Sequence, residues 1–187
     1  MPAGRVAALV PALRDVLTLR HLHGSGADCT SAEETRTPAR RLFHHCMFYG
    51  FLSCFASTSV AAIYHTALGW EAPYAYTSLP VWLGTGGGVG MLIGSAGLLT
   101  ERRRRDPLLG DPDQDSLDHS FIVLLFLAAL TGLLLLALRE RAIMSALLIV
   151  HLGVVLALFL TLPYGKFVHG IYRTVALVKH ARENLIG

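Results

Sequence analysis

The chain contains the stretch His151-Leu-Gly-Val-Val-Leu-Ala-Leu-Phe-Leu-Thr-Leu-Pro-Tyr-Gly-Lys-Phe-Val-His169, an apolar run with a histidine at each end. The two histidines are eighteen residues apart. At about 3.6 residues per turn this is about five whole turns, so both rings would leave a helix on one face. At about 1.5 Å per residue they would lie about 27 Å apart, close to the thickness of a bilayer core. Since an ionisable ring in lipid is costly, the pattern favours two stacked cofactors over a single site.

The composition is typical of an integral membrane protein. Of the 187 residues, 53% are hydrophobic and only 16% are charged. The net charge of +3 comes from arginines and lysines that flank apolar runs, so it does not indicate nucleic-acid binding. Cys29, Cys46 and Cys54 form no Cys-x-x-Cys pair, so we expect neither an iron–sulfur cluster nor a zinc site in this chain.

Four apolar runs predict an all-α fold, an integral membrane four-helix bundle. The expected spans are about 44–68, 81–100, 117–138 and 143–165. Pro163 and Gly165 predict a kink near the end of the last span. The expected domains are a cytoplasmic amphipathic segment and linker over 1–40, the transmembrane domain over 41–180 and a cytoplasmic tail over 181–187.

The second span is rich in glycine. A phosphate-binding loop is not indicated, because no strand precedes the glycines and no Lys-Ser/Thr pair follows them. Gly86, Gly90 and Gly94 have the small-xxx-small spacing of helix packing in membranes, which we favour. Glycines also let a backbone approach a flat macrocycle, and the sequence does not separate these uses.

The Lys and Arg distribution predicts the orientation. Only Arg139 and Arg141 lie on one side of the predicted bundle, and the other basic residues lie on the opposite side, including Arg102 to Arg105. We therefore expect both termini to face the cytoplasm, with the chain spanning a bacterial inner membrane.

Four histidines fall at two matched depths of this predicted bundle. Since the first span runs outward and the fourth inward, His44 and His169 would lie near the cytoplasmic face. His65 and His151 would lie near the outer face. Two imidazoles from facing helices at one level are what bis-histidine ligation of haem b requires. The pattern favours a cytochrome b-like bundle with two haem groups, with one haem or no cofactor as the alternatives.

Helical phase favours His44 over His45 as the ligand near the cytoplasmic face. From His44 to His65 is twenty-one residues, about 60° short of whole turns, whereas from His45 it is twenty residues, about 200° out of phase. His45 stays the alternative ligand. His119, at the mouth of the third span, is interpreted as an interfacial residue of a packing helix. The side chains available to hydrogen-bond the ligands are Tyr49, Ser57, Thr58, Ser59 and Tyr64.

Several motifs resemble known families. The stretch from His151 to His169 resembles the penultimate helix of the nitrate reductase gamma subunit, a di-haem cytochrome b that oxidises quinol. A closer resemblance is to the C-terminal membrane part of the tricarballylate/citrate utilization protein family TcuB, also called CitB. It covers about residues 17–180 and rests on Phe43-His-His45, Phe48-Tyr-Gly-Phe51, Ala61-Ala-Ile-Tyr-His65, Arg104-Arg-Asp-Pro107 and Leu162-Pro-Tyr-Gly-Lys-Phe-Val-His-Gly-Ile-Tyr172.

This resemblance implies a membrane electron-transfer subunit. Such a subunit passes electrons from a flavin-dependent tricarballylate dehydrogenase, which forms cis-aconitate, through iron–sulfur clusters to the quinone pool. The family's ferredoxin-like part, with its cluster cysteines, is not in this sequence, so we expect either a truncated start or a separate subunit that carries the clusters. In both cases an iron–sulfur domain or subunit is an expected partner. Tyr164 and Lys166 mark a candidate quinone site, although Lys166 also fits a topogenic charge.

Two other functions stay open. A haem-free membrane anchor would tolerate replacement of all four candidate histidines. A small tricarboxylate carrier would need anion-binding charges within the membrane, whereas the arginines lie at the ends of the predicted spans. In the favoured hypothesis the chain is a component of an oxidoreductase complex and not a complete enzyme.

Overall fold

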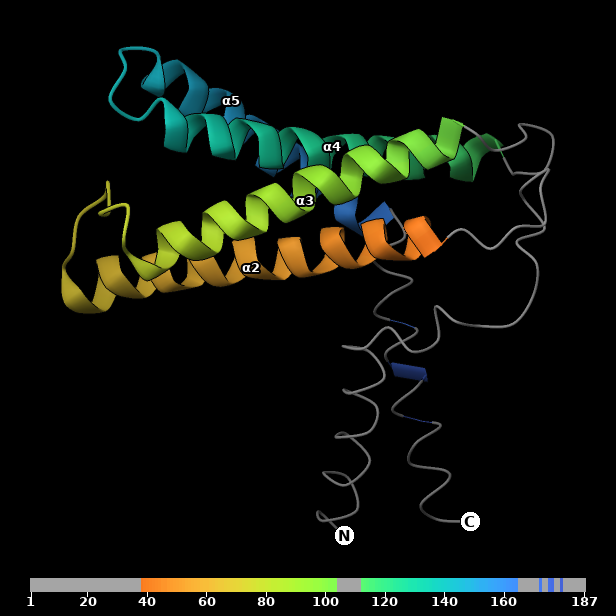
Figure 1. Ribbon diagram of the computed structural model, residues 1–187, viewed down its shortest axis with the longest axis horizontal. Helices are drawn as coiled ribbons and strands as arrows, with labels where there is room; N and C mark the ends of the chain where they lie inside the picture. The colour runs from red at the N-terminus through yellow and green to blue at the C-terminus, as the bar shows by residue number, and fades with distance from the viewer. Residues whose placement is uncertain (1–37, 104–111, 165–171, 173–174, 177–178, 180–187) are drawn as a thin grey trace, which may run out of the picture.

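The computed structural model describes residues 38–103 and 112–164, together with 172, 175, 176 and 179. In these residues the chain is all-helical (Figure 1). The helices are α2 Pro38–Leu68, α3 Leu79–Arg103, α4 Pro112–Ala137 and α5 Met144–Thr161, followed by the short 3-10 turn η3 Leu162–Tyr164. The amphipathic segment expected near the N-terminus and the tail expected over 181–187 lie outside the described residues.

All four helices are long and apolar enough to cross a membrane. Even α5, the shortest at 18 residues, is about 27 Å long, which matches the hydrocarbon core of a bilayer. Many outward side chains are large and apolar, such as Phe55 at 63% exposure, Trp82 at 69% and Ile149 at 73%. Such a surface is unfavourable in water and suits lipid. The predicted all-α chain of four apolar helices is confirmed and is compatible with a multi-pass membrane protein.

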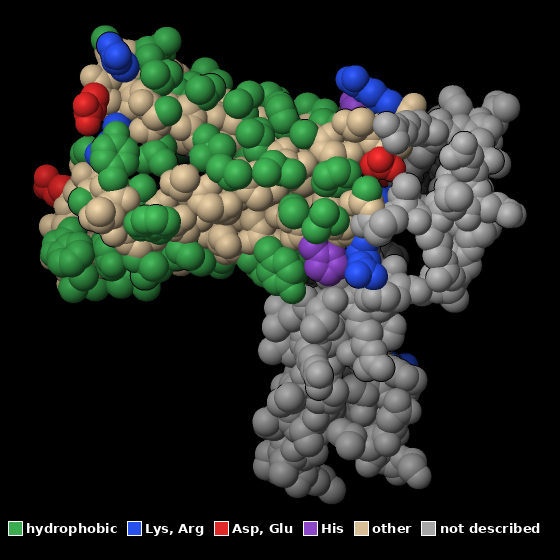
Figure 2. All heavy atoms as spheres, in the orientation of Figure 1, with side chains coloured by type: hydrophobic (Ala, Val, Ile, Leu, Met, Phe, Trp, Pro, Cys, Tyr) green, Lys and Arg blue, Asp and Glu red, His purple; other side chains and the backbone are tan. Residues whose placement is uncertain are grey.

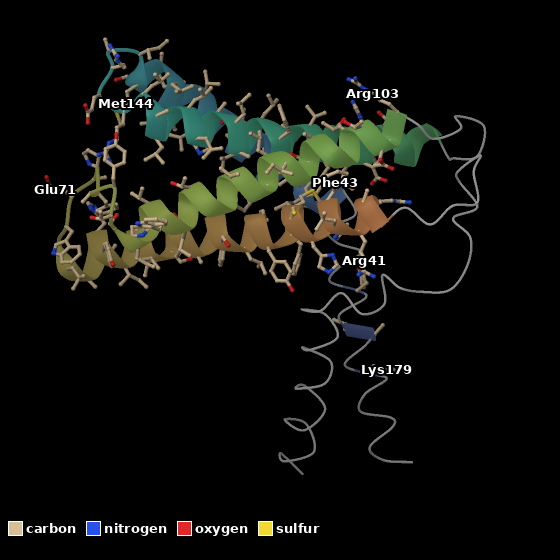
Figure 3. All side chains as sticks on the ribbon, viewed as in Figure 1. Arg41, Phe43, Glu71, Arg103, Met144 and Lys179 are labelled. Atoms are coloured by element: carbon tan, nitrogen blue, oxygen red, sulfur yellow. The ribbon has the colours of Figure 1, made fainter. Side chains whose placement is uncertain are left out.

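Successive helices run antiparallel. Arg41 and Phe43, at the start of α2, lie at the same end of the bundle as Arg103, whereas Glu71 and Met144 lie at the other end (Figure 3). α3 packs against both α2 and α4, and α5 packs against α4. Charged side chains gather at the two ends, and the band between them is apolar on the face seen in Figure 2. This is the charge distribution that a bundle crossing a bilayer requires.

Glycines let α2 and α3 approach until their backbones touch. A Cβ at Gly94 would lie 2.5 Å from the backbone nitrogen of Met47, and one at Gly87 would lie 2.8 Å from that of Cys54. From the α2 side, a Cβ at Gly50 would lie 2.5 Å from the nitrogen of Met91. No side chain fits at these three positions without moving the partner helix, so glycine sets the distance between the helices.

The predicted stripe of packing glycines, Gly86, Gly90 and Gly94, is confirmed at two positions and wrong at the third. Gly94 and Gly90 face α2, as expected. A Cβ at Gly86 would meet nothing within 4 Å among the described residues, and the neighbouring Gly87 makes the contact instead. The observed stripe therefore follows a mixed spacing of three and four residues, because a straight helix keeps one face only with such alternation.

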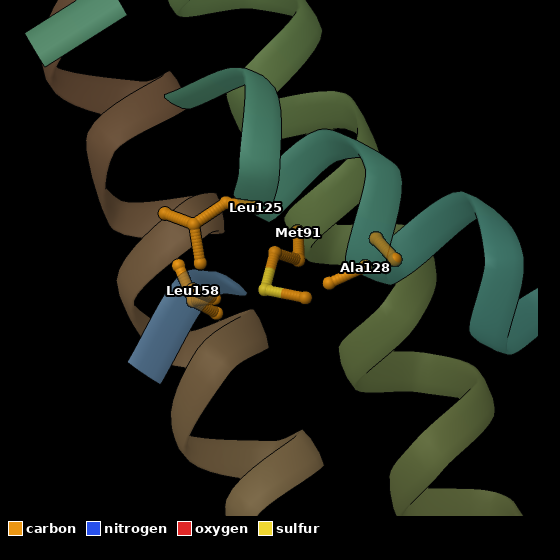
Figure 4. Close-up of a cluster of buried hydrophobic side chains, with 5 residues drawn as sticks. Met91, Leu125, Ala128 and Leu158 are labelled. Carbon is orange, nitrogen blue, oxygen red and sulfur yellow. The ribbon is translucent and has the colours of Figure 1, made fainter. Parts of the chain in front are cut away.

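The core of the described bundle lies where α3, α4 and α5 meet (Figure 4). Its buried members are Met91, Leu125, Ala128, Ala129 and Leu158. α2 packs Met47, Phe51 and Cys54 against this core from one side. The fully buried Ser95 donates its hydroxyl to the carbonyl oxygen of Met91 at 2.6 Å, so its polar group is satisfied within its own helix.

Arg139 joins the two connections at the other end of the bundle. Its Nη1 donates to the carbonyl oxygen of Tyr74 at 2.8 Å, and its guanidinium lies 3.3 Å from the centroid of the Tyr76 ring. Both tyrosines belong to the connection between α2 and α3, whereas Arg139 follows α4. The hydrogen bond and the cation–π contact therefore fix this connection against the turn between α4 and α5.

Candidate functional site

A histidine and a threonine meet between α4 and α5. The Nδ1 atom of His151 lies 2.8 Å from Oγ1 of Thr131. The Thr131 hydroxyl also donates to the carbonyl oxygen of Leu127, at 2.7 Å. A hydroxyl has one hydrogen, so toward His151 the threonine oxygen is the acceptor. We therefore infer that Nδ1 of His151 carries the ring proton and that Nε2 carries the lone pair.

Gly132, the next residue on α4, leaves room for the imidazole. A Cβ at this position would lie 3.2 Å from Cε1 of His151 and 3.8 Å from its Nδ1. The shorter distance is below ordinary van der Waals contact between carbon atoms. The ring of His151 thus lies directly against the backbone of α4, and any larger residue at position 132 would push against it.

The face of α5 that carries His151 is the face turned to the core. Leu158 belongs to the core and Val154 packs against it, seven and three residues after His151. At about 100° per residue, these three positions fall within about 60° of one another. The ring is half-buried, and its Nε2 makes no hydrogen bond to any residue that the structure describes. A neutral imidazole with its proton on Nδ1 and a free Nε2 has the form that ligates a metal.

His44 lies on the core-facing side of α2. Met47 and Phe51, three and seven residues further along, pack against the core. The Nδ1 atom of His44 is buried and has no hydrogen-bond partner in the described part of the chain. A buried polar nitrogen without a partner costs free energy, so the ring fits a role in which a bound group interacts with it.

The other two candidate histidines of α2 are placed differently. Since α2 is one helix, His65 stays within about 60° of His44, but its side chain is exposed. His45 points about 100° away from His44. Its Nδ1 lies 2.7 Å from the carbonyl oxygen of Arg41, which only accepts, so His45 also carries its proton on Nδ1. The choice between His44 and His45 therefore stays open.

The remaining predicted positions lie near or beyond the end of α5. His169 and Lys166 are outside the described residues, and Tyr164 is described only by its backbone, in η3. The α-helix ends at Thr161 and gives way to the 3-10 turn that contains Pro163, which has no N–H to donate. The five-turn spacing from His151 to His169 therefore rests on regular α-helix only as far as Thr161.

The donor set fits haem better than it fits a multidentate metal site. In the described part of the chain, no group of three or more His, Cys, Asp or Glu side chains is placed to hold a metal ion. Axial ligation of haem needs only two imidazoles, because the porphyrin supplies the other donors. The contact between His151 and Thr131 is compatible with this use, whereas Nδ1 of His44 has no acceptor in the described part of the chain.

Sequence reasoning missed Thr131 and Gly132. The signal was nevertheless present, because these two are the only polar residue and the only glycine between Phe121 and Leu138. In a span otherwise made of large apolar residues and alanine, such a pair marks a place where another group contacts the helix.

The described residues first define a class, an all-helical protein whose four apolar antiparallel helices are compatible with several membrane crossings. The family CitB, citrate utilization protein B, matches residues 3–186, so the chain belongs to this family. It is 51% identical to the Citrate utilization protein B of Escherichia coli over 188 residues, covering 100% of this chain and 50% of that protein. The chain thus spans about half the length of this curated relative. No solved structure matches it. The family resemblance in the motifs is therefore confirmed.

Proposed function

We propose that this chain is a membrane electron-transfer subunit that carries b-type haem. It would pass electrons from a flavin- and iron–sulfur-containing tricarballylate (citrate-utilization) dehydrogenase to the quinone pool. Membership of the citrate utilization protein B family supports the metabolic setting, and the four apolar helices support the membrane setting. The observation that carries the proposal is the 2.8 Å contact between Nδ1 of His151 and Oγ1 of Thr131, which leaves Nε2 without a hydrogen bond to any described residue.

The proposed axial ligands form two pairs, His44 with His169 and His65 with His151, with His45 as the alternative to His44. Bound haem b supplies one-electron oxidation and reduction. The protein's part is to present neutral imidazoles, to fix their tautomers and to exclude water with apolar side chains. The core-facing positions of His44 and His151 support these roles.

The proposed orientation is supported by the charges at the two ends. We propose that the end carrying Arg102 and Arg103 faces the cytoplasm of a bacterial inner membrane. In the sequence, this end has most of the basic residues, and the other end has Arg139 and Arg141. An iron–sulfur domain or subunit would then deliver electrons from the cytoplasmic side. The quinone site is proposed close to Tyr164 and Lys166.

The test is a redox difference spectrum of the chain in membranes from haem-replete cells. We expect a b-type spectrum on reduction by dithionite, and partial reduction of the same signal by a short-chain quinol. A dithionite-reduced minus oxidised spectrum without haem absorbance would overturn the proposal. That result would leave the haem-free anchor as the simplest function.

The quinol step separates the electron carrier from a protein that only binds haem. Reduction by quinol and reoxidation by quinone require electronic contact between the haem and the pool. A haem signal that dithionite reduces but no quinol affects would contradict the quinone part of the proposal. The control is the His119→Ala variant, which should give the same spectra as the wild type. His119 is exposed near the start of α4 and is not a proposed ligand.

A further inference from the structure

We propose that Thr131 and Gly132 of α4 are positioning residues for His151. Thr131 fixes which ring nitrogen is protonated, and Gly132 fixes how closely the ring lies against α4. The inference rests on the proposed function, because the nitrogen left free is the one that would bind haem iron. Neither residue is assigned a contact with the iron itself.

Thr131 selects one tautomer because its own hydrogen is already used. Threonines in these helices donate to the carbonyl oxygen four residues earlier, as Thr85 does to Val81 at 2.7 Å. Thr131 does the same to Leu127, so only its lone pairs remain for His151. The other tautomer of His151 would set two lone pairs against each other at 2.8 Å, so it is disfavoured.

The burial of Thr131 strengthens this selection. The residue is only 7% exposed, so water does not readily replace the threonine oxygen as the acceptor. A buried N–H without an acceptor is unfavourable, so the ring keeps its Nδ1 proton on the side of Thr131. An imidazole that donates its Nδ1 proton is also a stronger base at Nε2, which favours the oxidised state of an iron bound there.

Gly132 acts on the position of the ring and not on its proton. Because a Cβ would lie 3.2 Å from Cε1, a side chain here would turn or lift the imidazole of His151. The aim of Nε2 would change with it. Gly153 on α5 is a matched control, since a Cβ there would meet nothing within 4 Å among the described residues.

The first test needs no haem. The full chain is produced without haem, labelled with ¹⁵N-histidine and studied in lipid bilayers by solid-state NMR, with His151→Gln to assign the signal. We expect the Nδ1–H tautomer at His151 in the wild type, in Thr131→Ser and in the control Thr85→Val. In Thr131→Val we expect a shift toward the Nε2–H tautomer. An Nε2–H ring in the wild type overturns the proposal even if Thr131→Val does not fold.

The second test uses the haem-loaded chain, by redox titration and EPR spectroscopy. We expect Thr131→Val to move the midpoint potential of one haem to a more positive value, while Thr131→Ser stays close to the wild type. Gly132→Ala should change the low-spin EPR signal of that haem, and Gly153→Ala should not. Unchanged potentials in Thr131→Val, or an unchanged EPR signal in Gly132→Ala, overturn the role of that residue. Absence of haem from the wild type instead overturns the proposed function.

Discussion

The α2–α3 interface and the α4–α5 interface join their helices in different ways. Along α2–α3 the backbones touch, because Gly50 and Gly94 leave no space for a Cβ. Along α4–α5 side chains separate the helices, with Leu158 in the core and one polar contact between His151 and Thr131. Contacts between backbones therefore set the distance between α2 and α3. Between α4 and α5, side chains set the orientation of the His151 ring.

The two interfaces also differ in how they hold polar side chains. Glycine contacts fix the spacing of α2 and α3, and near one end of this interface the Ser57 hydroxyl donates to the carbonyl oxygen of Pro80. The interface that carries His151 pairs a large ring with a glycine and a hydroxyl, which together define its position and its proton. The α2–α3 contacts thus set the distance between two helices, and the α4–α5 contacts orient the candidate ligand His151.

The largest expected effect concerns the outer side of α5, which is turned away from both interfaces and carries exposed apolar side chains. Ile149 is 73% exposed and lies in the first half of the helix. Ile149→Asp should disfavour membrane insertion by up to about 2.5–3.5 kcal/mol, the value for the centre of a span, because a carboxylate within a span is poorly solvated. The measurement is the inserted fraction in isolated membranes, with Ile149→Leu as the control. Full insertion of the aspartate variant would contradict a transmembrane α5.

The next largest effect is expected at the α2–α3 interface. Gly94→Ala should destabilise the bundle by about 1–3 kcal/mol, because the new Cβ meets the backbone of Met47. Gly86→Ala, in the same helix, should be neutral or stabilising by up to about 1 kcal/mol, since alanine favours helix over glycine. Unfolding in mixed micelles measures both. Equal effects of the two substitutions would show that α2 and α3 do not touch along this stripe.

A smaller effect is expected at the connections. Arg139→Gln should cost about 1–2 kcal/mol, because it removes a charged hydrogen bond to Tyr74 and a cation–π contact with Tyr76. The same unfolding assay measures it, beside Arg141→Gln at an exposed position of the same turn. If both variants unfold alike, Arg139 does not join the two connections.

The smallest effect on stability is expected at the polar contact itself. Thr131→Val should cost only about 0.6 kcal/mol, and at most about 1.7, as interhelical hydrogen bonds in membranes do. It is measured in the same micelles as Gly94→Ala. A loss as large as that of Gly94→Ala would mean that the His151 contact holds the bundle together and does not merely orient a ring.

Much of the fold could be predicted from the sequence because lipid restricts the choices. Long apolar runs between charged residues leave little alternative to four helices. The glycine stripe was predicted less well, because seven glycines between Gly84 and Gly97 allow several faces. Only the backbone of α2 decides between Gly86 and Gly87, and that contact is tertiary.

The candidate site could likewise be predicted only in part from the sequence. The histidine positions follow from spacing, but the partner of His151 does not, because it depends on how α4 and α5 are aligned across their turn. Three of the five donors available on α2 are used elsewhere: the hydroxyls of Thr58 and Ser59 bond backbone carbonyls of their own helix, and that of Ser57 bonds Pro80. Thr131, twenty residues before His151, makes the contact with that ring instead.

The most direct test of the account is the haem content per chain in His151→Ala, measured as pyridine haemochrome on purified protein. We predict one haem fewer than in the wild type, with His119→Ala retaining the full content and both variants still in the membrane. A His151→Ala protein that keeps all of its haem would contradict the account, because the ring oriented by Thr131 would then ligate nothing.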